Sequence, residues 1–184
     1  LKRACEQALS AKVTNKEEAR RFFESAFTLY RFEDKNSQQR PFFTGYYEPV
    51  VQGSLTRTDE FTEPVLARPA DLETLQPYPT RAEIDAAGVT RFTPLLWLRD
   101  AIEVFMIQVQ GSAAVDLPDG QRVRLTYAGR NGATYTSIGR ILIEQGEIAP
   151  AEMTLARLKQ WVRDKGQKMG EPGRALLHRN HSYV

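Results

Sequence analysis

Residues 104–126, VFMIQVQGSAAVDLPDGQRVRLT, are the stretch of sequence that decides the fold. The first six of them, Val104 to Val109, form a compact apolar run that favours a buried β-strand. Behind this run, segments 115–117 and 123–125 alternate apolar and polar residues around Pro118-Asp119-Gly120, a turn sequence typical of a β-hairpin. The centre of the chain is therefore predicted to be β-structure.

Helices are predicted on the C-terminal side of this centre, beyond a glycine-rich segment. Gly146 can close the first of them, and the Thr154 hydroxyl can cap the second. The predicted helices cover residues 138–145, 155–165 and 172–178. In the second helix, four apolar residues recur on one face and are expected to be buried: Leu155, Leu158, Trp161 and Val162.

The N-terminal part of the chain also has a helical pattern. Asn15 begins a helix, with Glu18 placed three residues later as in a capping box. An apolar stripe on this helix is expected to pack in a core: Ala19, Phe22, Phe23, Ala26, Phe27 and Tyr30. From Pro41 the composition becomes aromatic and β-branched, so residues 42–51 predict a strand. Prolines between 64 and 94 limit the strands there to short ones.

Length and composition restrict the classes of protein that fit. A chain of 184 residues, 41% of them hydrophobic, can bury a core as one domain or as one domain and part of another. It has no apolar run of about 20 residues and no signal peptide, so we expect any export signal to lie outside it. The 25 basic and 23 acidic residues are spread along the chain, which does not make a nucleic-acid surface.

No metal site or cofactor is predicted. Cys5 is the only cysteine, which excludes a disulfide within the chain and a thiolate zinc cluster. His178 and His181 have no nearby companions with metal-ligand spacing. The sequence Gly-Arg-Asn-Gly at 129–132 is neither a phosphate-binding loop nor a dinucleotide fingerprint.

Three segments are richer in Gly, Tyr, Asn, Gln and Ser than core packing requires: 44–49, 108–112 and 127–139. Sugars have apolar ring faces on which aromatic side chains stack and hydroxyls that pair with amide and hydroxyl groups, while glycine lets the backbone come close. Each segment also has a structural interpretation. Residues 110–112 fit the turn after a strand, Asn131-Gly132 fits a tight turn, and Tyr46-Tyr47 fits one buried and one exposed strand position.

A complete catalytic apparatus is not evident. No serine stands in a nucleophile elbow with a histidine to activate it. The carboxylates that a glycan-cleaving enzyme could use are Glu48, Asp100, Glu103 and Asp116, and none stands in a context typical of a general acid. The residues alone therefore predict a binding surface without a catalytic residue.

Several of these stretches, taken in order, resemble the lytic murein transglycosylase A family. They are FTGYYEPVVQGS, LTRTDEFTEPVLARP, RAEIDAAG, VQGS, YAGRNGATYTSIGRILIEQGEI and RNHSYV, from about residue 42 to 184. The resemblance implies a mainly β fold with helices, of the α+β class. Residues 1–49 would be the helices and first strand of an incomplete double-psi β-barrel, and residues 50–184 an inserted, β-barrel-like substrate-binding domain.

The resemblance also implies an activity. Such enzymes cleave the bond between N-acetylmuramic acid and N-acetylglucosamine without hydrolysis, through one aspartic acid, and leave a 1,6-anhydro product. That acid is expected beyond the RNHSYV segment, so this chain would hold no catalytic residue and be inactive alone. The resemblance assigns glycan contacts to Thr44, Tyr46, Gln110, Gly111, Ser112, Tyr127, Gly129, Asn131, Tyr135 and Ser137.

The expected partner is therefore a peptidoglycan strand, with no nucleic acid. The resemblance places the protein as a monomer in the periplasm, associated with the outer membrane of a Gram-negative bacterium, with any anchor in a segment outside this chain. Two alternatives stay open. One is a carbohydrate-binding module without chemistry, and the other is a small β-barrel that binds single-stranded nucleic acid through Tyr46, Tyr127 and Tyr135.

Overall fold

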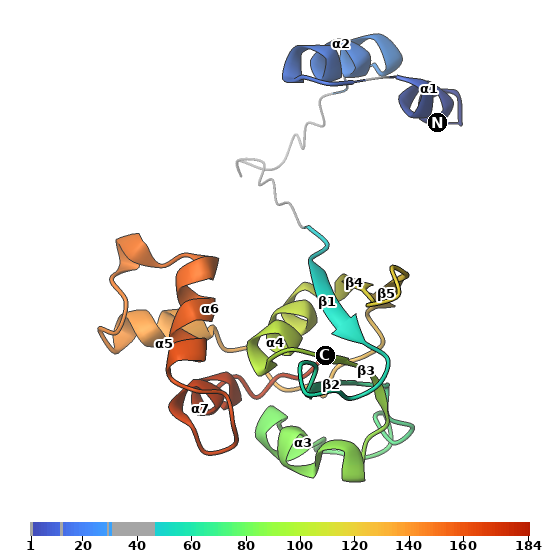
Figure 1. Cartoon of the computed structure of the whole chain (residues 1–184). Helices are drawn as coiled ribbons and strands as arrows, with labels where there is room; N and C mark the ends of the chain where they lie inside the picture. The colour runs from blue at the N-terminus through green and yellow to red at the C-terminus, as the bar shows by residue number, and fades with distance from the viewer. Residues whose placement is uncertain (1, 12, 29, 31–46) are drawn as a thin grey trace, which may run out of the picture. The chain divides into compact units, whose positions relative to one another are not determined.

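A computed structural model describes residues 2–11, 13–28, 30 and 47–184, in two compact units that comprise residues 1–44 and 45–184 (Figure 1). Thr44, Tyr46 and most of the strand predicted at 42–51 lie outside the described residues.

The first unit contains helices α1 (Lys2–Ser10) and α2 (Lys16–Ala26). The Asn15 side chain caps α2, as predicted, by accepting a hydrogen bond from the Glu18 amide at 2.9 Å. No described side chain of α2 is buried, however, and Phe23 is 61% exposed. The prediction that this apolar stripe packs in a core is therefore wrong for the described residues, because two short helices offer each other too little apolar surface.

The second unit is organised around a five-stranded sheet. Its strands are β1 (Val50–Ser54), β2 (Glu63–Leu66), β3 (Pro94–Leu98), β4 (Ser112–Asp116) and β5 (Arg122–Thr126). They lie in the order β2-β3-β1-β4-β5, and only the β1–β4 pair is parallel. The sheet is open, so within the described residues it is not a closed barrel. Pro64 lies in the edge strand β2 and Pro94 is the first residue of the inner strand β3, and both are positions where a missing amide donor is tolerated.

The hairpin predicted in the centre is confirmed. Strands β4 and β5 are antiparallel, with Val115 opposite Val123, and the turn between them contains Gly120 at a φ of 83°. The Leu117 amide donates to the Gln121 carbonyl across the turn at 2.8 Å.

The strand predicted at 104–109 is wrong: these residues belong to helix α4 (Ala101–Gln110). Asp100 caps its N-terminus by accepting from the Glu103 amide at 3.0 Å, and Gly111, with a φ of 77°, ends it. The helix is buried on several sides, so its apolar residues do not follow the one-faced period of an amphipathic helix. A short apolar run of this kind does not distinguish a strand from a buried helix.

Helix α4 lies between two hydrophobic cores. Val104 and Ile107 pack against the sheet with Leu98 and Val115. Ile102 and Phe105 pack on the other side against helices α5 (Ile138–Glu144), α6 (Leu155–Asp164) and α7 (Pro172–His178), which gather on one side of the sheet in Figure 1. A third, smaller core lies under α3 (Arg81–Ala87) and includes Tyr78, Ile84 and Phe92.

The three C-terminal helices are confirmed, and Thr154 caps α6 as predicted. Val162 is fully buried, but Leu155 is 38% exposed, so the predicted buried face of α6 is narrower than expected. Short 3₁₀ turns at Gly88–Thr90 and Pro150–Glu152 complete the unit. The α+β class is confirmed, with more residues in helices than in strands.

Candidate functional site

A cavity of about 120 Å³ lies where the C-terminal end of α4 meets the ends of β2 and β5. Its walls are largely apolar, but five of the residues predicted to contact a glycan line it: Gly111, Ser112, Tyr127, Gly129 and Asn131. Two of the three polar segments found in the sequence therefore converge on one cavity.

Pairing between β4 and β5 brings these two segments together. Gly111 ends α4, where its amide donates to the Ile107 carbonyl at 2.9 Å, and Ser112 begins β4 directly afterwards. In the hairpin register Ser112 lies opposite Thr126, the residue before Tyr127. The left-handed backbone at Gly111 favours glycine, because a side chain there would be strained.

Gly129 allows the loop after β5 to lie close to the segment after β2. A Cβ atom at this position would be 2.6 Å from the Leu72 side chain, closer than carbon atoms approach in proteins. The Arg68 guanidinium fixes the same loop by donating a hydrogen bond to the Ala128 carbonyl. Arg68 lines the cavity and was not singled out in the sequence.

Asn131 holds this loop to the C-terminal segment. Its side-chain oxygen accepts from the Tyr183 amide at 3.0 Å, and its side-chain nitrogen donates to the carbonyls of Pro79 and His181, both at 2.9 Å. Its own amide donates to the Tyr183 carbonyl at 3.0 Å. Asn131 is 7% exposed, so most of its hydrogen-bonding capacity serves to position the loop.

Tyr183, which Asn131 anchors, is half-buried and forms part of the cavity wall. Burial, with a smaller contribution from the nearby Asp85 carboxylate, raises the pKa of Tyr183 to about 12. The Arg81 guanidinium lies 4.8 Å from its ring and opposes this shift of the pKa. The Tyr183 phenol is therefore neutral at physiological pH.

Three other predicted contact residues lie elsewhere. Tyr135 and Ser137 line a second cleft, of about 220 Å³, between α4, α5 and α6. The Ser137 hydroxyl accepts a hydrogen bond from the Arg140 amide and so caps α5. Gln110 is half-buried at the end of α4 and lines neither cavity.

Gln108 is a cavity residue that the sequence reasoning missed. It is 7% exposed and lines the cavity with Ile107 and Gly111. Its side-chain oxygen has no hydrogen-bond partner within the described residues. The period of a helix, rather than that of the predicted strand, would have placed Gln108 and Gly111 on one side.

The candidate carboxylates are engaged away from the cavity. Asp100 pairs with Arg163 at 2.7 Å, and burial, followed by the charge of Asp100, raises the pKa of Glu103. The remaining two form ion pairs with strand β5, Asp116 with Arg122 and Glu48 with Arg124. No aspartate or glutamate is among the described residues that line the cavity.

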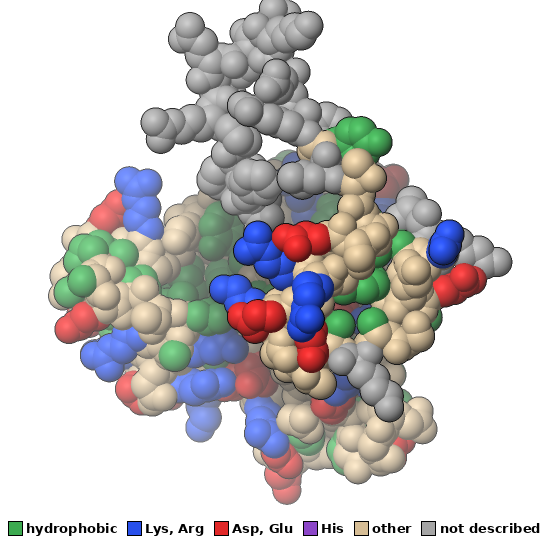
Figure 2. Space-filling view, turned by 90° about the horizontal axis from the view of Figure 1, so that it is seen from above, with side chains coloured by type: hydrophobic (Ala, Val, Ile, Leu, Met, Phe, Trp, Pro, Cys, Tyr) green, Lys and Arg blue, Asp and Glu red, His purple; other side chains and the backbone are tan. Residues whose placement is uncertain are grey.

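Within the described part of the chain, no group of three or more metal-ligating side chains could hold a metal ion. Nor is any of its helices long and apolar enough to cross a membrane. Basic and acidic side chains are interspersed on the face shown in Figure 2, without a basic stripe.

Comparison with known proteins agrees with the sequence resemblance. Residues 42–184 match the family model of the MltA specific insert domain. The chain belongs to the MltA family. It is 37% identical over 144 residues to the membrane-bound lytic murein transglycosylase A of Escherichia coli, an alignment that covers 77% of this chain and 38% of that relative. The corresponding protein of Vibrio cholerae is 33% identical over 155 residues, with 81% and 39% covered.

Solved MltA-family structures share the fold. The crystal structure of Escherichia coli MltA with bound chitohexaose superposes with a TM-score of 0.65 at 33% identity, over 77% of this chain and 41% of that one. LtgG, a lytic transglycosylase of Burkholderia pseudomallei, gives a TM-score of 0.74 at 34% identity, over 100% of this chain and 54% of that one. The chain thus spans about two fifths of the length of the curated relatives it matches.

Proposed function

We propose that this chain is the glycan-binding part of a lytic murein transglycosylase, an enzyme that cleaves peptidoglycan between N-acetylmuramic acid and N-acetylglucosamine and leaves a 1,6-anhydro end. Its curated relatives are lytic murein transglycosylases, and one solved relative holds chitohexaose, a polymer of the same aminosugar. The observation that carries the proposal is the convergence of Gly111, Ser112, Tyr127 and Gly129 on one cavity.

The proposed division of labour follows from what the cavity contains. Glycines that leave room beside the backbone, a hydroxyl and an exposed tyrosine ring suit a sugar, while the described lining holds no carboxylate to protonate a glycosidic oxygen. We place the acid in a part of the enzyme outside this sequence, as the family resemblance implies. Residues 1–49 would belong to the catalytic domain and residues 50–184 to the inserted domain.

The location and partners follow from the same family. The relatives are named membrane-bound and come from Gram-negative bacteria, so we place the protein in the periplasm at the outer membrane, acting as a monomer on peptidoglycan strands without a cofactor. Nucleic-acid binding is disfavoured by the lining, because Tyr127 and Tyr135 belong to different cavities.

The proposal is tested by comparing two proteins, this chain and the same chain extended to the full length of its relatives. Each is incubated with purified peptidoglycan, and soluble 1,6-anhydro-muropeptides are measured by mass spectrometry. We expect release only from the extended protein and chitohexaose binding by both. An extended protein that binds glycan but releases no anhydro product would identify a carbohydrate-binding module instead.

A further inference from the structure

A third cleft, of about 310 Å³, lies between strands β2 and β3 on one side and helices α3 and α7 on the other. A larger part of its lining is polar than in the cavity beside Tyr127. Arg81 and Arg174 are both buried in its wall, while Arg57 is exposed beside Trp97.

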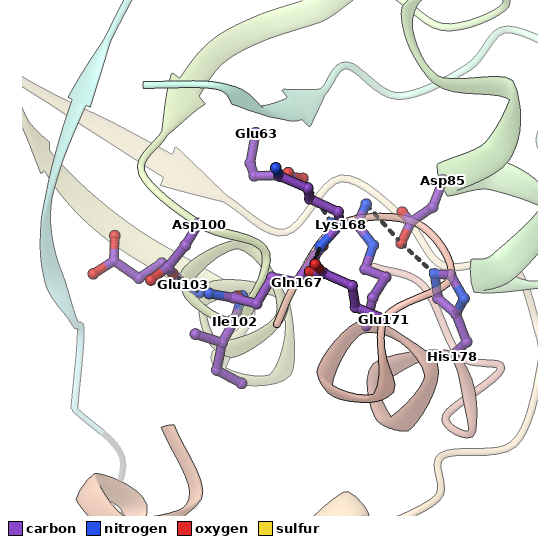
Figure 3. A network of polar contacts seen from close by, with 10 residues as sticks. Glu63, Asp85, Asp100, Ile102, Glu103, Gln167, Lys168, Glu171 and His178 are labelled. Carbon is purple, nitrogen blue, oxygen red and sulfur yellow. Dashed lines mark hydrogen bonds and ion pairs between the residues drawn. The ribbon is translucent and has the colours of Figure 1, made fainter. Parts of the chain in front are cut away.

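The Arg174 charge is matched within the protein. One of its terminal nitrogens is 2.8 Å from a Glu63 carboxylate oxygen, and the other is 3.2 Å from Asp85. Asp85 also contacts His178 at 3.0 Å, and the close-up in Figure 3 shows these side chains joined in one network. Both carboxylates that line the cleft are therefore bound to Arg174.

Arg81 is different, because it is 3% exposed and has no carboxylate within 4.0 Å among the described residues. Its Nε donates to the Ser182 carbonyl at 3.1 Å, and the rings of Phe105 and Tyr183 lie 4.7 and 4.8 Å from its guanidinium carbon. The two terminal nitrogens have no acceptor within the described part of the chain. A buried cation usually has an anionic partner, so Arg81 is the feature of this cleft that points to a ligand.

Arg57 adds a second positive charge at the exposed side. Its guanidinium carbon is 6.0 Å from the centre of the Trp97 ring, and it forms no ion pair with the described residues. The cleft contains three guanidinium groups and two carboxylates, so one further anionic group would balance its charge.

We propose that this cleft binds a peptide carboxylate, held by the terminal nitrogens of Arg81, with Arg57 at the entrance and Trp97 against the apolar part of the peptide. The planar guanidinium fork matches the two oxygens of a carboxylate. Peptidoglycan carries short peptides that end in carboxylates, so the favoured occupant is a stem peptide. Only this choice of occupant rests on the proposed function; the carboxylate site does not.

The test is a calorimetric titration of the chain with N-acetyl-D-alanyl-D-alanine, with its C-terminal amide as the matched control. We expect the acid to bind at least about tenfold more tightly than the amide, since a charge-assisted contact is lost. Equal affinities of acid and amide, or no binding of either, overturn the site. The L,L-dipeptide distinguishes sources: equal binding of both enantiomers overturns the stem peptide as occupant, independently of anhydro-muropeptide release.

Variants locate the binding. Arg81→Gln should abolish the preference for the acid, and Arg81→Lys should restore part of it. Because Arg81 is buried and its substitution can unfold the protein, the exposed Arg57→Gln is the second test, with an expected loss of about threefold for one partly exposed charge. Arg91→Gln, which removes an exposed arginine outside the cleft that pairs with Asp71, is the control. An affinity that Arg57→Gln and folded Arg81→Gln both leave unchanged would overturn the proposal.

Discussion

The tyrosines at the two ends of the glycine-rich segment, Tyr127 and Tyr135, are similarly exposed, at 59% and 52%, but their surroundings differ. Tyr127 lines the cavity at the end of α4 together with Ser112 and Arg68, whereas Tyr135 lines the cleft between α4, α5 and α6. Composition made the segment one candidate site. The structure divides it at Asn131, which fixes the first half against the C-terminal segment. The difference teaches that polar sequence marks a site only where the chain brings its polar atoms together.

Asn131→Ala tests the first half of the glycine-rich segment, and its expected effect on stability is the largest. It leaves the Tyr183 amide and the carbonyls of Pro79 and His181 without their partner inside the protein. We expect the free energy of unfolding to fall by about 3 kcal/mol, measured by urea denaturation. Thr134→Ala, an exposed change in the same segment, should alter it by less than about 0.5 kcal/mol. Similar small losses in both variants would show that the anchor is not needed.

Alkaline pH is expected to lower the free energy of unfolding through Tyr183, the residue that Asn131 anchors. Its folded pKa of about 12 lies above the unfolded value near 10, so the stability from the neutral buried phenol is complete below pH 10 and is lost as the pH rises towards 12. The loss amounts to about 2–3 kcal/mol, measured by denaturation at a series of pH values. Tyr183→Phe should lose less stability over this interval, and an unchanged pH dependence in that variant would contradict the assignment.

The second half of the segment is tested by Ser137→Ala, which removes the cap of α5. We expect a loss of about 1 kcal/mol in unfolding free energy, with chitohexaose affinity unchanged. Ser137→Asp keeps an acceptor for the Arg140 amide and should recover most of that stability. A large loss of glycan affinity in both variants would return Ser137 to the glycan site.

Tyr127→Ala and Tyr135→Ala are expected to have the smallest effect on stability, because both rings are exposed. The two variants should differ in chitohexaose affinity. Tyr127→Ala should bind about fivefold more weakly, because a stacking contact of about 1 kcal/mol is lost, and Tyr135→Ala should bind almost as the unchanged chain does. Calorimetric titration of the two variants measures it. The reverse order would place the glycan on the cleft between α4, α5 and α6.

Local signals in the sequence were sufficient for much of the fold. The Pro-Asp-Gly hairpin and the caps at Asn15 and Thr154 depend on residues within a few positions of each other, and each was predicted. Helix α4 was not, because burial on several sides removes the period that distinguishes a helix from a strand. Gln110, which the family resemblance assigned to the glycan, does not line the cavity, whereas Gln108 does.

The anchoring contacts could not be predicted from local pattern. Arg81 donates to the Ser182 carbonyl, 101 positions away, and Asn131 binds Tyr183 across 52 positions. Single-sequence reasoning has no means to pair such residues, so Asn131 was assigned to the ligand and Arg81 to no role at all. Only the folded structure shows that Asn131 and Arg81 each hold the C-terminal segment in place.

The most direct test of the central claim is an NMR titration of the chain with chitohexaose, followed at the backbone amides. We predict chemical-shift changes at Gly111, Ser112 and residues 127–129, with residues 153–158 of the cleft between α4, α5 and α6 unaffected. Shifts confined to residues 153–158, or no shifts at saturating sugar, would contradict a glycan site at the cavity beside Tyr127.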